Sequence, residues 1–154
     1  MVQRPSSRAG CCLGALMVFL AAVREGVEAG VAYHGGDTQK YLGEADGLHE
    51  PLLTHLAEED EFISKAAQAE IKAALAKKPN ATVYSYPGQH HALSRRGGSQ
   101  YDAAAATLAY VRTYEFLNHK LRDRKPSTGF RSLLRAVLFV QTDQLIASPF
   151  ENLS

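Results

Sequence analysis

Two adjacent cysteines between glycines are the first residues in the sequence whose types and spacing could do chemistry. The run Gly10-Cys11-Cys12-Leu13-Gly14 has the spacing of a nucleophile elbow, a sharp turn that bulky flanking side chains would obstruct. Such a turn leads directly into a helix, whose N-terminus favours the reactive thiolate form of cysteine. The pattern predicts that Cys12 is a nucleophile. Taken alone, it is equally compatible with a buried, inert cysteine pair.

Two further residues could activate this cysteine. A cysteine nucleophile needs a base within reach, and the base needs an acid that orients it. Asp60 lies in the acidic run 58–61 after a short apolar stretch, and His91 follows a later stretch rich in β-branched and aromatic residues. Each residue alone is typical of a solvated loop. Their chain order of nucleophile, acid and histidine is the order found in α/β-hydrolases, so the three together predict a catalytic triad.

The elements that must position these residues alternate along the chain. Apolar periodicity predicts helices at about 13–24, 64–78 and 102–121, and short apolar or β-branched runs predict strands at 27–34, 51–57 and 81–86. Residues 1–10 and 37–50 show neither period and are predicted to lack regular structure. This alternation indicates parallel βαβ units, which place active-site loops beyond the C-terminal ends of the strands.

Composition limits the classes of function. The 154 residues are 45% hydrophobic, as in a globular domain, and 17 basic against 16 acidic side chains leave a net charge of +1. So small a net charge gives no field that would recruit nucleic acid or a membrane surface, and charge therefore names no partner. Six histidines and two cysteines are not grouped as a zinc site requires, so neither a metal nor another cofactor is expected. An adjacent cysteine pair cannot build an ordinary disulfide framework, which favours the reducing cytoplasm.

The N-terminus permits a different interpretation. Arg4 and Arg8 precede the apolar run 11–23, as the basic and apolar regions of a signal peptide do. The chain would then be a secreted or membrane-associated binding module, processed near Ala22 and carrying a usable glycosylation sequon at 80–82. Cleavage at that point would discard Cys12 and make the positions of the predicted acid and histidine coincidental. We therefore prefer the enzyme.

From about residue 10 to residue 121 the sequence resembles the dienelactone hydrolase family. The resemblance rests on the elbow and on the spacing of the triad, because Asp60 lies 48 positions after Cys12 and His91 lies 31 positions after Asp60. It also rests on Tyr86-Pro87-Gly88 before the histidine and on Tyr101-Asp102-Ala103-Ala104 after it. The resemblance implies that Cys12 is the nucleophile, that His91 is the general base and acid, and that Asp60 fixes His91.

The resemblance also implies a reaction and two further site residues. The reaction is hydrolysis of a small ester or lactone through a thioester at the cysteine, as in a carboxymethylenebutenolidase. The backbone N–H of Leu13 would supply half of the oxyanion hole. Arg95 matches a family arginine that pairs with a substrate carboxylate, for which a guanidinium is well suited. Two positions depart from the family pattern, with Leu93 in place of a phenylalanine and Ala15 in place of a second elbow glycine.

The family fold has several strands before the elbow, where this sequence has ten residues without strand character. The resemblance thus implies a partial α/β-hydrolase fold, with a parallel sheet flanked by helices and the N-terminal strands missing. We expect an unstructured leader over 1–9, the C-terminal half of the hydrolase domain over 10–122, and a basic linker with an amphipathic tail over 123–154. The second oxyanion N–H of such folds follows an early strand. A truncated, inactive fragment is therefore the alternative to an active hydrolase.

Overall fold

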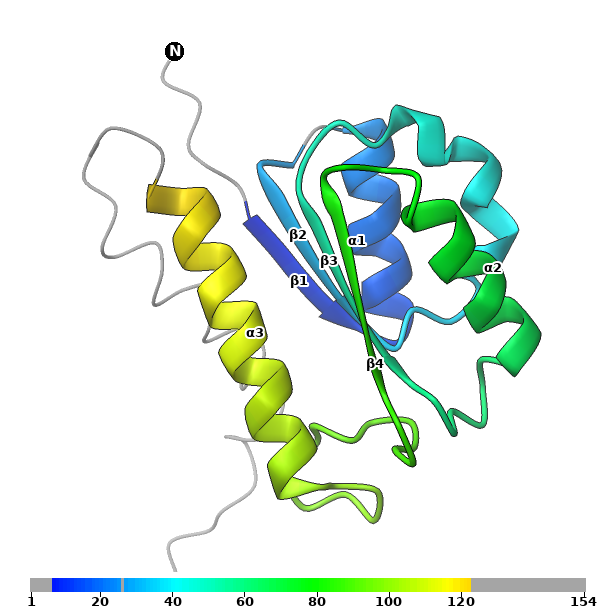
Figure 1. Cartoon of the computed structure of the whole chain (residues 1–154), viewed down its shortest axis with the longest axis vertical. Helices are drawn as coiled ribbons and strands as arrows, with labels where there is room; N and C mark the ends of the chain where they lie inside the picture. Colours follow the sequence, from blue (N-terminus) through cyan, green and yellow to red (C-terminus); the bar gives the residue numbers. More distant parts are fainter. Residues whose placement is uncertain (1–6, 26, 123–154) are drawn as a thin grey trace, which may run out of the picture.

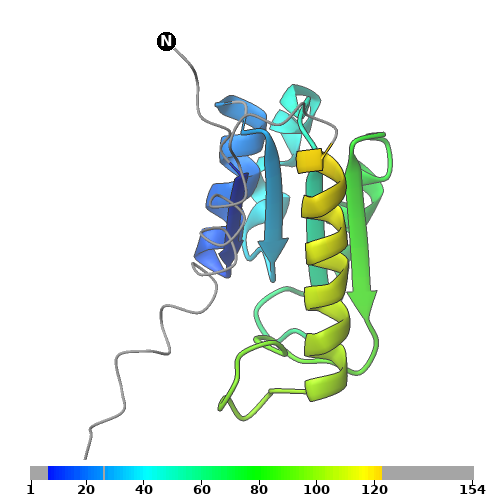
Figure 2. The same ribbon diagram turned by 90° about the vertical axis from the view of Figure 1, so that its left-hand side faces the viewer.

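Residues 7–25 and 27–122, which this computed structural model describes, form three layers (Figures 1 and 2). The middle layer is a wholly parallel sheet with its strands in chain order: β1 (Ser7–Cys11), β2 (Ala29–Tyr33), β3 (Leu52–Ala57) and β4 (Ala81–Tyr86). One face is covered by α1 (Leu13–Arg24), the 3-10 helix η1 (Thr38–Gly47) and α2 (Lys65–Leu75), and the other by α3 (Ala103–Arg122). The predicted parallel sheet flanked by helices is confirmed.

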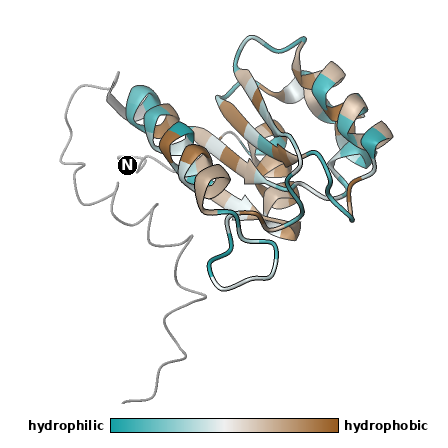
Figure 3. Ribbon diagram, turned by 60° about the horizontal axis from the view of Figure 1, so that its bottom comes forward, coloured by the Kyte–Doolittle hydropathy of each residue, from teal (hydrophilic) through white to brown (hydrophobic). Residues whose placement is uncertain are grey.

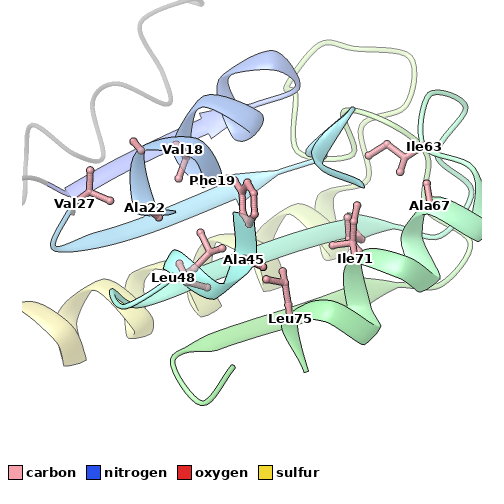
Figure 4. Close-up of a cluster of buried hydrophobic side chains, with 13 residues drawn as sticks. Val18, Phe19, Ala22, Val27, Ala45, Leu48, Ile63, Ala67, Ile71 and Leu75 are labelled. Carbon is pink, nitrogen blue, oxygen red and sulfur yellow. The ribbon is translucent and has the colours of Figure 1, made fainter. Parts of the chain in front are cut away.

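The two central strands are buried along their whole length because helices cover both faces of the sheet. Side chains alternate along a strand, so Leu52 and Leu56 of β3 pack with α1 and α2, while Leu53 and Ala57 pack on the side of α3. Figure 4 shows the first of these clusters, in which side chains of α1, η1 and α2 converge. Coloured by hydropathy, the strands carry brown segments, whereas teal appears mainly on α2, α3 and the loops (Figure 3).

Two regions differ from the sequence prediction. The expected unstructured leader is wrong for Ser7 to Ala9, which belong to β1 and pair with β2. Among the described strands β1 has a neighbour on one side alone and is only partly buried, so its residues need not show the apolar pattern on which the prediction relied. The expected loop over 37–50 contains η1, which is mostly polar because it buries few side chains, among them Ala45. Residues 1–6 and the expected tail 123–154 lie outside the described residues.

Local capping explains where two helices begin. The Ser64 hydroxyl accepts a hydrogen bond from the Ala67 N–H at 3.2 Å and so caps α2. The Asp102 carboxylate accepts one from the Ala105 N–H at 2.7 Å at the start of α3. Within the described ranges, no helix combines the length and apolar content needed to cross a bilayer.

A buried polar network fastens three strands to α3. His55 of β3 is fully buried, with Nδ1 2.8 Å from the Tyr86 hydroxyl and Nε2 3.0 Å from the Thr113 hydroxyl. Its ring stacks on Tyr33, whose hydroxyl lies 2.6 Å from the same threonine oxygen. Burial lowers the pKa of His55 to about 3, so this imidazole is neutral in the folded protein at ordinary pH.

We expect His55 to make the fold sensitive to acid. Between about pH 6.5, the ordinary histidine value, and about pH 3, the unfolded chain binds a proton that folded His55 does not. Stability therefore falls with falling pH across this window, by up to about 1.4 kcal/mol per pH unit. Urea unfolding from pH 7 to pH 4 should show a steeper loss for the wild type than for His55→Gln, whose amide can still bond both hydroxyls. Parallel stability curves for the two proteins would contradict this assignment.

Candidate active site

The three predicted triad residues meet at one edge of the sheet because all four strands are parallel. Cys12 follows β1 directly, Asp60 lies three residues beyond β3, and His91 lies five residues beyond β4. Backbone hydrogen bonds continue past the strand ends and hold the first loop residues in place. The Cys12 N–H donates to the Tyr33 carbonyl at 2.9 Å, and the Glu58 N–H donates to the Tyr86 carbonyl at 3.1 Å.

The cysteine occupies the sharp turn that its flanking glycines predicted. Cys12 has φ 54° and ψ −118°, a conformation that costs free energy for any residue with a side chain. A Cβ atom on Gly10 would lie 2.4 Å from the backbone of Gly14, so the residue before the cysteines must be glycine. A Cβ on Gly14 would meet no described atom within 4 Å. The expected crowding is therefore present on one flank of the elbow and not on the other.

A continuous relay joins the three side chains. Cys12 Sγ lies 2.7 Å from His91 Nε2, and His91 Nδ1 lies 2.8 Å from Asp60 Oδ2. The other carboxylate oxygen of Asp60 accepts hydrogen bonds from the N–H groups of Phe62 at 2.9 Å and Ile63 at 3.2 Å. The buried carboxylate is thus fixed from one side and fixes the imidazole on the other. This is the geometry in which a histidine can move a proton to and from a sulfur nucleophile.

Asp60 and His91 each stabilise the charged form of the other. Burial alone would raise the pKa of Asp60, but the neighbouring His34 and His91 imidazoles and the Phe62 N–H outweigh it and hold this pKa below its ordinary value. Hydrogen bonds with Asp60 and then with Cys12 raise the pKa of His91 to about 10. At neutral pH His91 is therefore an imidazolium, and its Nε2 lies against the sulfur of Cys12.

Glu61 is a further site residue, which the sequence analysis treated only as part of an acidic run. Its carboxylate lies 2.7 Å from His90 Nδ1 and accepts the backbone N–H of His91 at 3.2 Å. On the other side of the histidine, Leu93 is fully buried, and its carbonyl accepts the Asp102 N–H at 3.0 Å. The loop that carries His91 is thereby held on both sides of this residue. Contacts between two loops leave no signal in sequence spacing.

The two substrate-contacting residues that the resemblance implied have different surroundings. Leu13 is the first residue of α1, so its N–H has no acceptor within the helix and remains available beside the cysteine. Arg95 is exposed, and its guanidinium makes no hydrogen bond or ion pair with the residues that the structure describes. The structure does not bring Arg95 into contact with the triad.

The fold also brings a second histidine to the carboxylate of Asp60. His34, which follows β2, is buried, and its Nδ1 lies 3.6 Å from Asp60 Oδ2. One ligand atom from each of His34, Asp60 and His91 lies within 4.8 Å of the others, a group that could hold a metal ion. Sequence spacing gave no sign of this group because its three members come from three different loops.

Comparison with known proteins gives one consistent result. The sequence profile of the dienelactone hydrolase family matches residues 7–121. Over 118 residues the chain is 38% identical to an Azospirillum brasilense protein named as a candidate carboxymethylenebutenolidase, covering 76% of this chain and 51% of that protein. Over 117 residues it is 32% identical to the Pseudomonas putida carboxymethylenebutenolidase, covering 76% of this chain and 49% of that enzyme.

A solved structure agrees on the fold. The structure of a candidate dienelactone hydrolase from Klebsiella pneumoniae superposes with a TM-score of 0.64 at 22% identity, over 71% of this chain and 50% of that one. The chain spans about half the length of the curated relatives that it matches.

We expect Glu61, and not its neighbour Glu59, to support the reactivity of Cys12. Glu61→Ala frees the loop of His91, whereas Glu59→Ala removes only an exposed ion pair with Lys65. A misplaced base typically costs up to about 100-fold in rate. Alkylation of Cys12 by iodoacetamide at pH 7, followed by mass spectrometry, should slow by about threefold or more in Glu61→Ala and stay near wild type in Glu59→Ala. Equal rates in the two variants would show that Glu61 does not position the histidine.

Proposed function

The chain belongs to the dienelactone hydrolase family, and from this premise we propose that it hydrolyses small carboxylic esters or lactones through a thioester at Cys12. The observation that carries the proposal is the relay from Cys12 Sγ to His91 Nε2 at 2.7 Å and from His91 Nδ1 to Asp60 Oδ2 at 2.8 Å. The names of the curated relatives support a butenolide-type lactone as the substrate class.

In the first half of the proposed reaction the enzyme is acylated. The thiolate of Cys12 attacks the carbonyl carbon, and the carbonyl π electrons move to the oxygen, which the Leu13 N–H stabilises. When this intermediate collapses, the C–O bond to the leaving group breaks. The leaving oxygen takes the Nε2 proton of His91, for which an imidazolium with a raised pKa is the right starting state. In a lactone the leaving alcohol stays tethered to the acyl group.

The second half returns the enzyme to its starting state. Acylation turns the sulfur into a thioester, so the contribution of Cys12 to the raised pKa of His91 disappears and the neutral imidazole becomes accessible. His91 then takes a proton from water, whose oxygen attacks the thioester carbon. Collapse breaks the C–S bond and restores the thiolate beside the imidazolium. The net reaction consumes one ester bond and one water, and it yields an acid and an alcohol.

Residues around the relay support a small, partly apolar substrate. The Phe62 ring is 77% exposed and lies edge-on to His91 with ring centroids 4.8 Å apart, and the Leu13 side chain is 72% exposed beside the cysteine. These two side chains offer an apolar rim at the nucleophile. We propose that Arg95, four residues beyond His91, binds a carboxylate on the substrate from the solvent side.

The proposed reaction places requirements on the cellular compartment and on the oxyanion hole. We propose the reducing cytoplasm, because the proposed mechanism needs Cys12 in its reduced form. We also propose that full activity requires a second oxyanion donor of the kind that an early loop supplies in these folds. Loss of one such donor typically costs about 100- to 1000-fold in rate. A truncated fragment that does not turn over substrate is therefore the second candidate, and this chain spans about half the length of its curated relatives.

Acyl transfer should depend on Cys12 and not on its neighbour Cys11. We expect an aryl ester to leave an acyl group on Cys12 that intact-mass spectrometry detects, with Cys12→Ala abolishing it and Cys11→Ala leaving it unchanged. Repeated release of product identifies the active hydrolase, whereas one equivalent per chain without turnover identifies the inactive fragment. Acylation that survives Cys12→Ala would refute both forms of the proposal.

Arg95 should affect the binding of charged substrates selectively. We expect Arg95→Ala to raise KM about tenfold or more for an ester that bears a carboxylate, because a charge-assisted bidentate contact is lost. The same variant should leave KM for a neutral ester nearly unchanged. Arg96→Ala is the matched control, since Arg96 is the adjacent exposed arginine. If both arginine variants change KM alike, general surface charge and not a specific contact attracts the substrate.

A further inference from the structure

His34 is buried without any polar partner at hydrogen-bond distance. Its side chain is 1% exposed, and neither ring nitrogen has a hydrogen-bond partner within the described part of the chain. Burying a polar group in this way costs free energy, and buried polar side chains are nearly always satisfied. Its backbone has φ 53°, a left-handed conformation that non-glycine residues rarely adopt. An apolar side chain would avoid the first cost, so His34 calls for an explanation beyond packing.

The surroundings of His34 point to the catalytic carboxylate. Its Nδ1 lies 3.6 Å from Asp60 Oδ2, a little beyond hydrogen-bond distance, and its ring centroid lies 5.0 Å from that of His91. The Asp60 oxygen that faces His34 is the one that accepts from His91, while the other oxygen is occupied by two backbone N–H groups. A small rotation of the buried imidazole would complete a second donor bond to this oxygen.

The backbone fixes His34 at this place. Its N–H donates to the His55 carbonyl at 3.0 Å, which extends the pairing of β2 with β3 by one residue. Its own carbonyl accepts the Gly36 N–H at 2.8 Å in the turn that follows. The imidazole is thus presented to Asp60 by the same sheet edge that presents Cys12. Distances of this kind are often long in an enzyme without substrate and shorten during catalysis.

We propose that His34 is a positioning residue of the hydrolase, which donates its Nδ1–H to Asp60 Oδ2 and so extends the relay to Cys12, His91, Asp60 and His34. The inference rests on the proposed function. A second donor holds the carboxylate in the orientation that aims His91 Nε2 at the sulfur, and it acts on the chemistry only through Asp60.

Two substitutions separate this role from packing. His34→Phe keeps a ring of similar size and removes both nitrogens. His34→Asn places an amide N–H close to the position of Nδ1, and asparagine tolerates positive φ well. Should the phenylalanine variant not fold, His34→Gly removes the donor in a residue that accepts this φ freely.

The experiment measures the rate at which iodoacetamide alkylates Cys12 at pH 7. A Cys11→Ala background leaves Cys12 as the one thiol that can react. We expect His34→Phe to slow alkylation about tenfold and His34→Asn to restore most of the rate. In an Asp60→Asn background the same two substitutions should change the rate less than twofold, because the residue through which His34 acts has lost its charge.

Three results would overturn the proposal. They are an unchanged rate in His34→Phe, equal slowing in His34→Phe and His34→Asn, and an undiminished effect of His34→Phe in the Asp60→Asn background. A failure of the proposed function gives a different result, because alkylation would then be insensitive to His91→Gln in the otherwise wild-type chain. Thermal unfolding of every variant shows whether a slowed rate reflects loss of the fold.

Discussion

The hydrogen bond between His91 Nδ1 and Asp60 Oδ2, at 2.8 Å, joins two loops that are 31 residues apart and sets the direction in which the imidazole faces Cys12. The Asp60 carboxylate can be buried because two backbone N–H groups donate hydrogen bonds to its other oxygen. A charged carboxylate without such partners would be costly there. The parallel sheet makes the bond possible by ending β1, β3 and β4 at one edge. The strained turn at Cys12 then places the sulfur within reach of the imidazole.

The sequence was sufficient for the parts of the fold that bury long apolar faces. The predicted helix from Leu13 to about Arg24 agrees with α1, whose buried side chains recur along the sequence. The predicted strand at 81–86 agrees with β4, which is only partly buried but is rich in β-branched and aromatic residues. It was insufficient for β1, whose partly exposed strand carries no such pattern, and for the mostly polar η1. The triad residues could be proposed from type, order and spacing, and the structure brings them together.

The site residues that the sequence did not reveal act across loops. Glu61 binds the loop of His91, and His34 faces Asp60. Outside the site, His55 of β3 joins the sheet to α3, and all of these contacts link segments that are distant in the sequence. The neighbouring sequence does not distinguish such a histidine or glutamate from any other polar residue. The chain belongs to the dienelactone hydrolase family and spans about half the length of the curated relatives that it matches. Cys12, Asp60 and His91 stand in the order that α/β-hydrolases share for nucleophile, acid and histidine.

The most direct test of the relay is the pKa of His91 itself, measured by NMR from the imidazole proton shifts and assigned with a His91→Gln variant. The relay predicts a titration midpoint near 10, because Asp60 and Cys12 both stabilise the imidazolium. A midpoint near the ordinary histidine value of about 6.5 would mean that Asp60 and Cys12 do not stabilise the imidazolium, which would contradict the proposed charge state of the relay.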